Sequence, residues 1–241
     1  MNIEKSVALV TGANRGIGRE LVRALLDAGA AKVYACARNP DTLTSVVALD
    51  SVRVKAAQVD VTNKESIVAL SKMTGDVNLL INNAGVLDFG NILEVSDETL
   101  QRDFETNFYG KLFMARAFAP AIERNGGGAI VNILTLVSLV SAPGLAAYNA
   151  SKAAAWSMTM SLRASLAGKG VAVHGVFPGA VDTDMIAAVE MPKASASEVA
   201  NAIVAGIADN QEDIFPDGMS KQVYAAWCSD HKAVERQFAS M

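Results

Sequence analysis

The stretch that decides the fold is Thr11-Gly12-Ala13-Asn14-Arg15-Gly16-Ile17-Gly18. A β-branched apolar run from Ser6 to Thr11 precedes it, and a run with helical apolar spacing from Ile17 to Ala28 follows it. A glycine turn between a strand and a helix lets the backbone approach a pyrophosphate, which then lies at the helix N-terminus. The spacing is GxxxGxG rather than GxGxxG, but its strand-to-helix position predicts a dinucleotide site.

Outward from this turn, strand-like and helical patterns alternate along the chain. Further strand-like runs occur at 32–37, 52–59, 77–81, 129–134, 171–176 and 213–215, and helical runs near 41–49, 63–73, 97–122, 148–166, 195–208 and 221–238. This alternation predicts a parallel sheet with right-handed crossovers. Because we find no internal repeat and no low-complexity linker, we expect one α/β domain over residues 1–241.

The composition limits the classes of partner. The net charge is −4, and no basic run suggests a nucleic-acid backbone as partner. Cys36 and Cys228 match no metal or disulfide spacing, so we expect reduced thiols, a cytoplasmic location and no metal. The N-terminal region has no apolar span of 18 residues, so we expect neither a membrane segment nor an export signal.

A second stretch, Tyr148-Asn149-Ala150-Ser151-Lys152, indicates chemistry. Residues four apart on a helix share a face, about 6 Å apart, so the phenol and the ammonium can line one wall of a cleft. A neighbouring positive charge favours phenolate. Lowering a tyrosine pKa from about 10 to neutrality requires about 4 kcal/mol, of which one lysine supplies part. A cationic cofactor ring or a helix N-terminus would have to supply the rest.

Two arginines favour NADP(H) over NAD(H). In dinucleotide folds, a residue about 20 positions after the glycine turn contacts the adenosine ribose: an acid accepts from the 2′-hydroxyl, and an arginine meets a 2′-phosphate. Here that position is Arg38, at the end of the second strand-like run, and Arg15 inside the turn can converge on the same phosphate. The alternative is that both are ordinary surface arginines.

Five motifs together resemble the short-chain dehydrogenase/reductase family. They are TGANRGIG at 11–18, NNAG at 82–85, Asn107 in the long helix, YNASK at 148–152 and PGAVDTDM at 178–185. They occur in the family's order and spacing, and the resemblance spans residues 5 to 208. It implies a Rossmann-type, doubly wound sheet of seven parallel strands flanked by helices. It also implies hydride transfer between a nicotinamide cofactor and a carbonyl/alcohol pair.

The resemblance implies four catalytic residues. Tyr148 would protonate the carbonyl oxygen during reduction, and Lys152 would lower the Tyr148 pKa and hold the nicotinamide ribose. Asn107 would hold a water that links Lys152 to solvent. The family usually has a serine thirteen residues before the tyrosine, and in this chain that position is Thr135. Ser138, ten residues before Tyr148, is the other candidate for holding the substrate oxygen.

The resemblance also implies the cofactor contacts beyond the glycine turn. They form three groups: the wall beside the adenosine ribose, the adenine edge and the nicotinamide clamp. In that order, the residues are Asn83, Ala84 and Gly85; Asp60 and Val61; and Pro178, Gly179, Val181 and Thr183. Asp60 has a structural alternative as a loop or cap residue, and Asp182 and Asp184 read as turn or cap residues.

The motifs do not specify the substrate. Residues 185–195 would form a short substrate lid, and residues 86–95 the pocket rim. Four side chains, Leu87, Phe89, Leu136 and Leu139, would line an apolar wall, which suits an apolar ketone or aldehyde. The helical tail over 217–241 departs from the common family pattern, so both a homodimer and a homotetramer stay possible.

Two other functions fit the same motifs. One is a non-catalytic NADPH-binding sensor or regulator, which only the threonine at position 135 favours. The other is an elimination or epimerisation on the same fold. A pure binder has little need for Tyr148, Lys152 and Asn107 together, so the reductase hypothesis is preferred.

Overall fold

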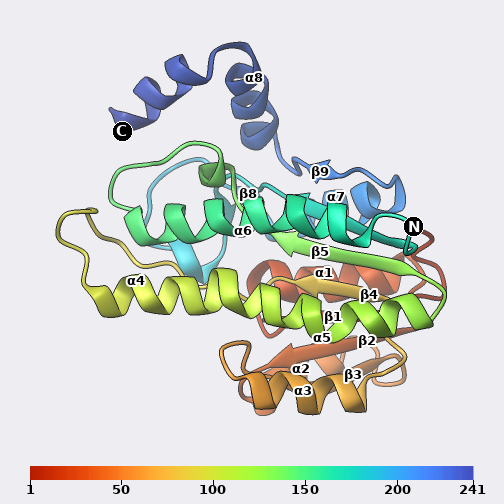
Figure 1. Cartoon of the computed structure of the whole chain (residues 1–241). Coiled ribbons are helices and arrows are strands. Elements are labelled where there is room, and N and C mark those ends of the chain that lie inside the picture. The colour runs from red at the N-terminus through yellow and green to blue at the C-terminus, as the bar shows by residue number, and fades with distance from the viewer. Residues whose placement is uncertain (241) are drawn as a thin grey trace.

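A seven-stranded parallel sheet forms the centre of the protein, as the computed structural model of residues 1–240 shows (Figure 1). The strand order is β3-β2-β1-β4-β5-β6-β9. The strands are β1 (Val7–Thr11), β2 (Lys32–Ala37), β3 (Val54–Gln58), β4 (Leu79–Asn82), β5 (Gly128–Ile133), β6 (Val171–Val176) and β9 (Asp213–Ile214). The order reverses between β1 and β4, and this switch point is where doubly wound sheets bind ligands. The predicted fold class is confirmed.

Helices cover both faces of the sheet. On one face, α1 (Gly16–Asp27), the short α2 (Thr44–Val47) and α7 (Ala196–Ala208) pack in one apolar core. On the other, α3 (Lys64–Met73), α5 (Lys111–Arg124) and α6 (Ala146–Leu166) pack in a second. Strand side chains alternate between the two cores: Ala8 and Val10 face the first, and Leu9 faces the second.

The long helical stretch predicted over 97–122 is present but not uniform. It comprises α4 (Asp97–Phe104), a π-helical turn η2 (Glu105–Gly110) and α5. The π-helical turn contains Asn107. Such turns are rare inside α-helices and occur frequently at functional sites.

Element boundaries differ from the sequence expectation in a few places. The third strand begins at Val54 and not at 52, because Val52 lies in a turn with 79% of its surface exposed. The tail helix α8 (Gly218–Ala239) begins before 221, where the Asp217 side chain accepts from the Ser220 N–H. A small parallel sheet of β7 (Val181–Asp182) and β8 (Ala194–Ser195) was not predicted. Two-residue strands carry too little periodicity to be seen in a sequence.

The short helices lie in connecting segments: the 3₁₀ helices η1 (Pro40–Leu43), η3 (Leu136–Ser138) and η4 (Asp184–Ile186). The tail helix α8 extends beyond the sheet and is bent at Asp230, where the backbone is not helical (Figure 1). Beyond the bend, Val234 and Phe238 pack against Leu136 and Val140 in the segment after β5. The tail thereby covers η3.

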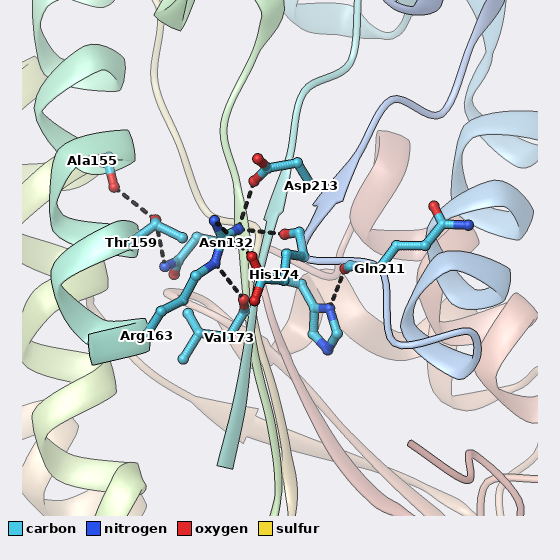
Figure 2. Close-up of polar contacts among 9 residues, drawn as sticks. Asn132, Ala155, Thr159, Arg163, Val173, His174, Gln211 and Asp213 are labelled. Atoms are coloured by element: carbon cyan, nitrogen blue, oxygen red, sulfur yellow. Dashed lines mark hydrogen bonds and ion pairs between the residues drawn. The ribbon is translucent and has the colours of Figure 1, made fainter. Parts of the chain in front are cut away.

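Polar contacts fix α6 and β9 to the sheet (Figure 2). The Asn132 side chain donates to the Thr159 hydroxyl of α6 at 3.0 Å, inside the core. Arg163 of α6 donates to the Val173 carbonyl at 2.9 Å and pairs with Asp213 at 2.6 Å. His174 Nδ1 lies 2.6 Å from the carbonyl of Gln211, and burial lowers the pKa of this imidazole. The Arg163–Asp213 pair and the His174–Gln211 contact hold the edge strand β9 in place. In residues 1–240, no helix is both long and apolar enough to cross a membrane.

Candidate functional site

The glycine turn between β1 and α1 is packed so closely that a side chain would not fit. A Cβ on Gly18 would lie 2.1 Å from the Gly12 carbonyl oxygen, and Gly12 itself has a φ of +64°. Asn83 holds the same turn from β4, because its side-chain amide donates to the Thr11 and Gly12 carbonyls at 2.9 and 3.1 Å. The main-chain N–H groups of Asn83 and Ala84 donate to the Thr11 hydroxyl, both at 3.0 Å. The turn and the end of β4 therefore form one rigid unit.

The start of α1 suits an anionic group. Arg15 occupies the N-cap position but makes no side-chain cap hydrogen bond, and the first turn of α1 contains no acidic residue. The first N–H groups of the helix and its positive end therefore have no competing side-chain oxygen. A phosphate group fits this arrangement, as it does at other helix N-termini that follow a glycine turn. Ile17, the second residue of α1, is partly buried and packs against the first core.

The structure places the two arginines in different surroundings. Arg15 Nη1 lies 3.2 Å from Asp184 Oδ2, and both side chains are 70% exposed. An exposed pair of this kind contributes little to stability, so Arg15 stays available to another anion. Arg38 is exposed directly after β2 and has no ion pair among residues 1–240. Asp184 was expected to act as a turn or cap residue, and its pairing with the glycine turn was not foreseen.

Residues 178–183 lie against this turn and against the catalytic residues. A Cβ on Gly16 would lie 3.1 Å from the Thr183 side chain. The Gly179 N–H donates to Asp217 at 2.9 Å, and the Pro178 carbonyl accepts from the Leu136 N–H at 3.0 Å. Val181 is buried in the first core, so only its main chain can face a ligand.

Asp60 acts as a loop residue in the free protein, which is the structural alternative to contacting adenine. Its carboxylate accepts from the Thr62 N–H at 3.0 Å and the Thr62 hydroxyl at 2.7 Å, within its own turn. Val61 is buried against Gly110, where a Cβ would lie 3.0 Å from its side chain. The segment is therefore ordered by local contacts at the carboxyl end of β3.

The predicted pair Tyr148 and Lys152 lies on one face of α6. Both side chains are buried, and Lys152 Nζ lies 5.4 Å from the centre of the Tyr148 ring. The Lys152 ammonium donates to the Ile133 carbonyl at the end of β5, at 3.0 Å. The Ile133 carbonyl thus holds the Lys152 ammonium at the carboxyl end of the strands.

Thr135, directly after β5, supplies a hydroxyl to the tyrosine. Its side chain lies close enough to the Tyr148 phenol to lower the Tyr148 pKa. In the free protein its hydroxyl donates to the Pro178 carbonyl at 3.3 Å. Ser138 is buried in η3, and its hydroxyl has no hydrogen-bond partner within residues 1–240. Between these two candidates, the structure brings Thr135 to the phenol.

The electrostatics of the pair differ from the sequence expectation. Burial raises the pKa of Tyr148 well above its ordinary value, and the nearby Asp103 carboxylate raises it further. Burial also lowers the pKa of Lys152 to about 8, which Asp103 opposes. In the free protein the loss of water around the phenol therefore dominates the Tyr148 pKa. The lowering of this pKa by Lys152 together with a bound cofactor stays a prediction.

Asn107 clamps two segments together. Its side-chain oxygen accepts from the Val86 N–H at 3.0 Å, and its amide donates to the Val86 carbonyl at 2.9 Å and the Ser151 hydroxyl at 3.0 Å. A Cβ on Gly85 would lie 3.0 Å from the Asn107 side chain and 3.6 Å from Lys152 Nζ. The Asn107 side chain is thus committed to protein partners beside Lys152.

Two buried charged residues near this site escaped the sequence reasoning. Lys111 donates to the Asn82 and Ala84 carbonyls, both at 3.0 Å, and burial lowers its pKa. Asp103 is fully buried in α4. Each lies four residues from Asn107, one before and one after, so helical spacing is the signal that could have indicated both.

The predicted apolar wall of the substrate pocket is only partly present. Leu136 is buried against the tail helix, and Leu139 packs with Trp156 and Phe177, so both have packing roles. Phe89 remains exposed over 62% of its surface, in the segment that also carries the exposed Leu93. The expectation was wrong for Leu136 because the covering contact comes from residues about 100 positions away.

Comparison with known proteins defines the family. The short chain dehydrogenase family model matches residues 6–194, so the chain belongs to this family. A short-chain type dehydrogenase/reductase of Picea abies is 34% identical over 194 residues, which cover 74% of this chain and 72% of the relative. The 3-oxoacyl-acyl-carrier-protein reductase of Vibrio cholerae is 33% identical, with 77% of each chain covered.

Solved structures agree with this assignment over nearly the whole chain. A short chain dehydrogenase from Burkholderia cenocepacia, in complex with NADP, has a TM-score of 0.93 and 38% identity and covers 99% of both chains. A short chain dehydrogenase/reductase from Burkholderia phymatum, in complex with NAD, has a TM-score of 0.88 and 26% identity, covering 98% of this chain and 96% of that one. The similarity to the first includes the tail helix α8.

Proposed function

We propose that this protein is an NADP(H)-dependent oxidoreductase that interconverts a carbonyl compound, an apolar ketone or aldehyde, and its alcohol. The observation that carries the proposal is the buried group of Tyr148, Lys152 and Thr135 at the carboxyl end of the sheet. The Thr135 side chain lies close enough to the phenol to lower its pKa, and the Lys152 ammonium lies 5.4 Å from the centre of the same ring. This group suits proton transfer to an oxygen held at the Tyr148 hydroxyl.

The glycine turn supports a dinucleotide as cofactor. The uncapped start of α1 and the close packing at Gly18 fit a pyrophosphate, and the exposed Arg15 and Arg38 fit a 2′-phosphate. The neighbour from Burkholderia cenocepacia binds NADP and the one from Burkholderia phymatum binds NAD, so the family neighbours support a nicotinamide cofactor of either kind. The two arginines favour NADP(H).

A bound nicotinamide supplies the hydride. The protein supplies the proton, because burial keeps the Tyr148 pKa above its ordinary value and the phenol is protonated at neutral pH. Thr135 orients the substrate oxygen toward the phenol. Lys152, with a pKa of about 8, carries its positive charge at neutral pH beside the oxygen on which negative charge develops. In the free protein the phenol therefore carries the proton that a reduction requires.

The surrounding residues then act as supports. Asn107 fixes the segment after β4 to α6 through Val86 and Ser151. Its predicted role of holding a water that links Lys152 to solvent is part of the proposal. The segment from Pro178 to Thr183 forms the nicotinamide clamp, and residues 185–195 form the lid above it. The exposed Phe89, Leu93 and Met185 near the rim and lid favour an apolar substrate.

The test is oxidation of NADPH and of NADH by the purified protein with a panel of aromatic and alicyclic ketones and aldehydes. We expect turnover with NADPH preferred, and loss of turnover by at least about a thousandfold in Tyr148→Phe. Tyr109→Phe is the matched control, because Tyr109 is 45% exposed. Tight NADPH binding without consumption across the panel, or full turnover by Tyr148→Phe, would refute the proposal.

A further inference from the structure

Asp103 is a buried acid that the proposed reaction does not use. Its side chain in α4 is fully buried, and neither carboxylate oxygen has a hydrogen-bond partner among residues 1–240. The preceding residue, Arg102, points away from the core, because its side chain is 59% exposed and contacts Asp88 in the predicted pocket rim. A buried acid without a partner is costly, so it requires another explanation than packing.

The charged and titratable groups around Asp103 are few. Helix α4 packs against α6 and continues into η2, and α6 carries Lys152 and Tyr148. The charge of Asp103 acts on both of these residues. The remaining charges on these elements lie toward solvent or are held elsewhere. Arg102 contacts Asp88, Asp97 and Glu98 are exposed, and Glu105 accepts from the Gln101 side chain at 2.7 Å. Lys111 donates to the Asn82 and Ala84 carbonyls. Lys152 is therefore the buried cation that Asp103 acts on.

We propose that Asp103 is a positioning residue on α4, whose negative charge keeps Lys152 in its ammonium form and Tyr148 in its protonated form. This inference rests on the proposed function, since it concerns the proton that Tyr148 transfers. Asp103 lies one helical turn before Asn107, so it is fixed on the same stretch of helix that clamps Ser151 and Val86. It contacts neither substrate nor cofactor and acts only through its charge.

The direction of the effect follows from the sign of the charge. Burial raises the pKa of Asp103 to about 6, against the lowering effect of Arg102 and Lys152. Above that pH the group is a carboxylate, which favours the ammonium form of Lys152 and disfavours the phenolate form of Tyr148. Removing the charge must therefore lower both pKa values. Reduction requires the charged ammonium and the protonated phenol. The pH above which the reduction rate falls therefore moves to a lower value when the Asp103 charge is removed.

The first test does not depend on turnover. The protein is labelled at the aspartate carboxyl carbons and titrated by NMR, with the Asp103 signal assigned by its loss in Asp103→Asn. We expect a pKa near 6 for the whole protein and a higher value in Lys152→Met, where the opposing cation is absent. A titration near the ordinary value of about 4, or no change in Lys152→Met, would overturn the inference.

The second test is the pH profile of kcat/KM for carbonyl reduction. In Asp103→Asn we expect the alkaline limb to move about one pH unit lower, with the neutral-pH rate less affected. Asp97→Asn is the matched control, because it makes the same change at an exposed site on α4. An unmoved limb in Asp103→Asn would overturn the inference while leaving the proposed function intact. If no variant turns over but the NMR result holds, the proposed function fails and the coupling between Asp103 and Lys152 stands.

Discussion

Replacing Gly18 with alanine should both destabilise the protein and weaken cofactor binding. The new Cβ would lie 2.1 Å from the Gly12 carbonyl oxygen and 2.6 Å from the Asn83 amide nitrogen. Real Cβ contacts lie at 3.0 Å or beyond, so α1 and the glycine turn would have to separate by about 1 Å. Alanine is otherwise the better helix former, by about 1 kcal/mol.

The opposing contributions can be compared. Forcing an extra methyl group into a packed site costs about 1–3 kcal/mol. The separation also weakens the Asn83 hydrogen bonds to the Thr11 and Gly12 carbonyls, each worth about 1 kcal/mol. The clash and the lost hydrogen bonds exceed the gain in helix propensity, so we expect a net destabilisation of about 2 kcal/mol. Because the first turn of α1 and the glycine turn form the pyrophosphate site, NADPH affinity should fall at least about tenfold.

The assay is urea unfolding together with NADPH fluorescence titration. Gly75→Ala is the matched control, since no heavy atom lies within 4 Å of its Cβ position, and both quantities should stay close to those of the unmodified protein. The reasoning is refuted if Gly18→Ala unfolds at the same urea concentration and binds NADPH within about twofold of the unmodified protein.

Three further predictions concern the arginines, Asn107 and Asp103. Arg15→Ala and Arg38→Ala should each raise the NADPH Kd about tenfold and leave the NADH Kd unchanged by calorimetry; Arg23→Ala, another arginine on α1, should change neither. Asn107→Ala should lower the free energy of unfolding by about 3 kcal/mol, because the Val86 N–H and carbonyl lose their buried partner; a loss below about 1 kcal/mol would contradict that account. Asp103 binds its proton more tightly in the folded than in the unfolded state, since its folded pKa is about 6 against an ordinary 3.8, so stability falls as the pH rises through that interval. The stability of Asp103→Asn relative to the unmodified protein should therefore rise by about 2 kcal/mol between pH 4 and pH 7 in urea titrations, and a constant difference would refute the assignment.

Local spacing made much of the fold and of the catalytic pair predictable. The glycine turn, its flanking strand and helix, and the four-residue spacing of Tyr148 and Lys152 are properties of short segments. The alternation of strand-like and helical runs was enough to predict the parallel sheet. Boundaries shifted where a turn residue is apolar, as at Val52.

The features that could not be predicted depend on contacts between distant segments. Arg15 pairs with Asp184, and Leu136 is buried by Phe238, and neither partner can be read from the neighbouring sequence. An aspartate on a helix is usually exposed, so the four-residue spacing from Asn107 indicates the face on which Asp103 lies but not that the side chain is fully buried. The Tyr148 pKa in the free protein is raised mainly by the burial of the phenol itself, and the sequence does not show how deeply a side chain is buried.

The central claim is that the buried Tyr148 group transfers a proton while a hydride passes from a nicotinamide to a carbonyl carbon. The most direct measurement is mass spectrometry of the alcohol formed from a ketone of the panel with NADPH that carries deuterium at the transferable position of C4. The account predicts one deuterium on the carbinol carbon with the unmodified protein and no alcohol above background with Tyr148→Phe. Bound NADPH that is never consumed, or labelled alcohol formed equally well by Tyr148→Phe, would contradict it.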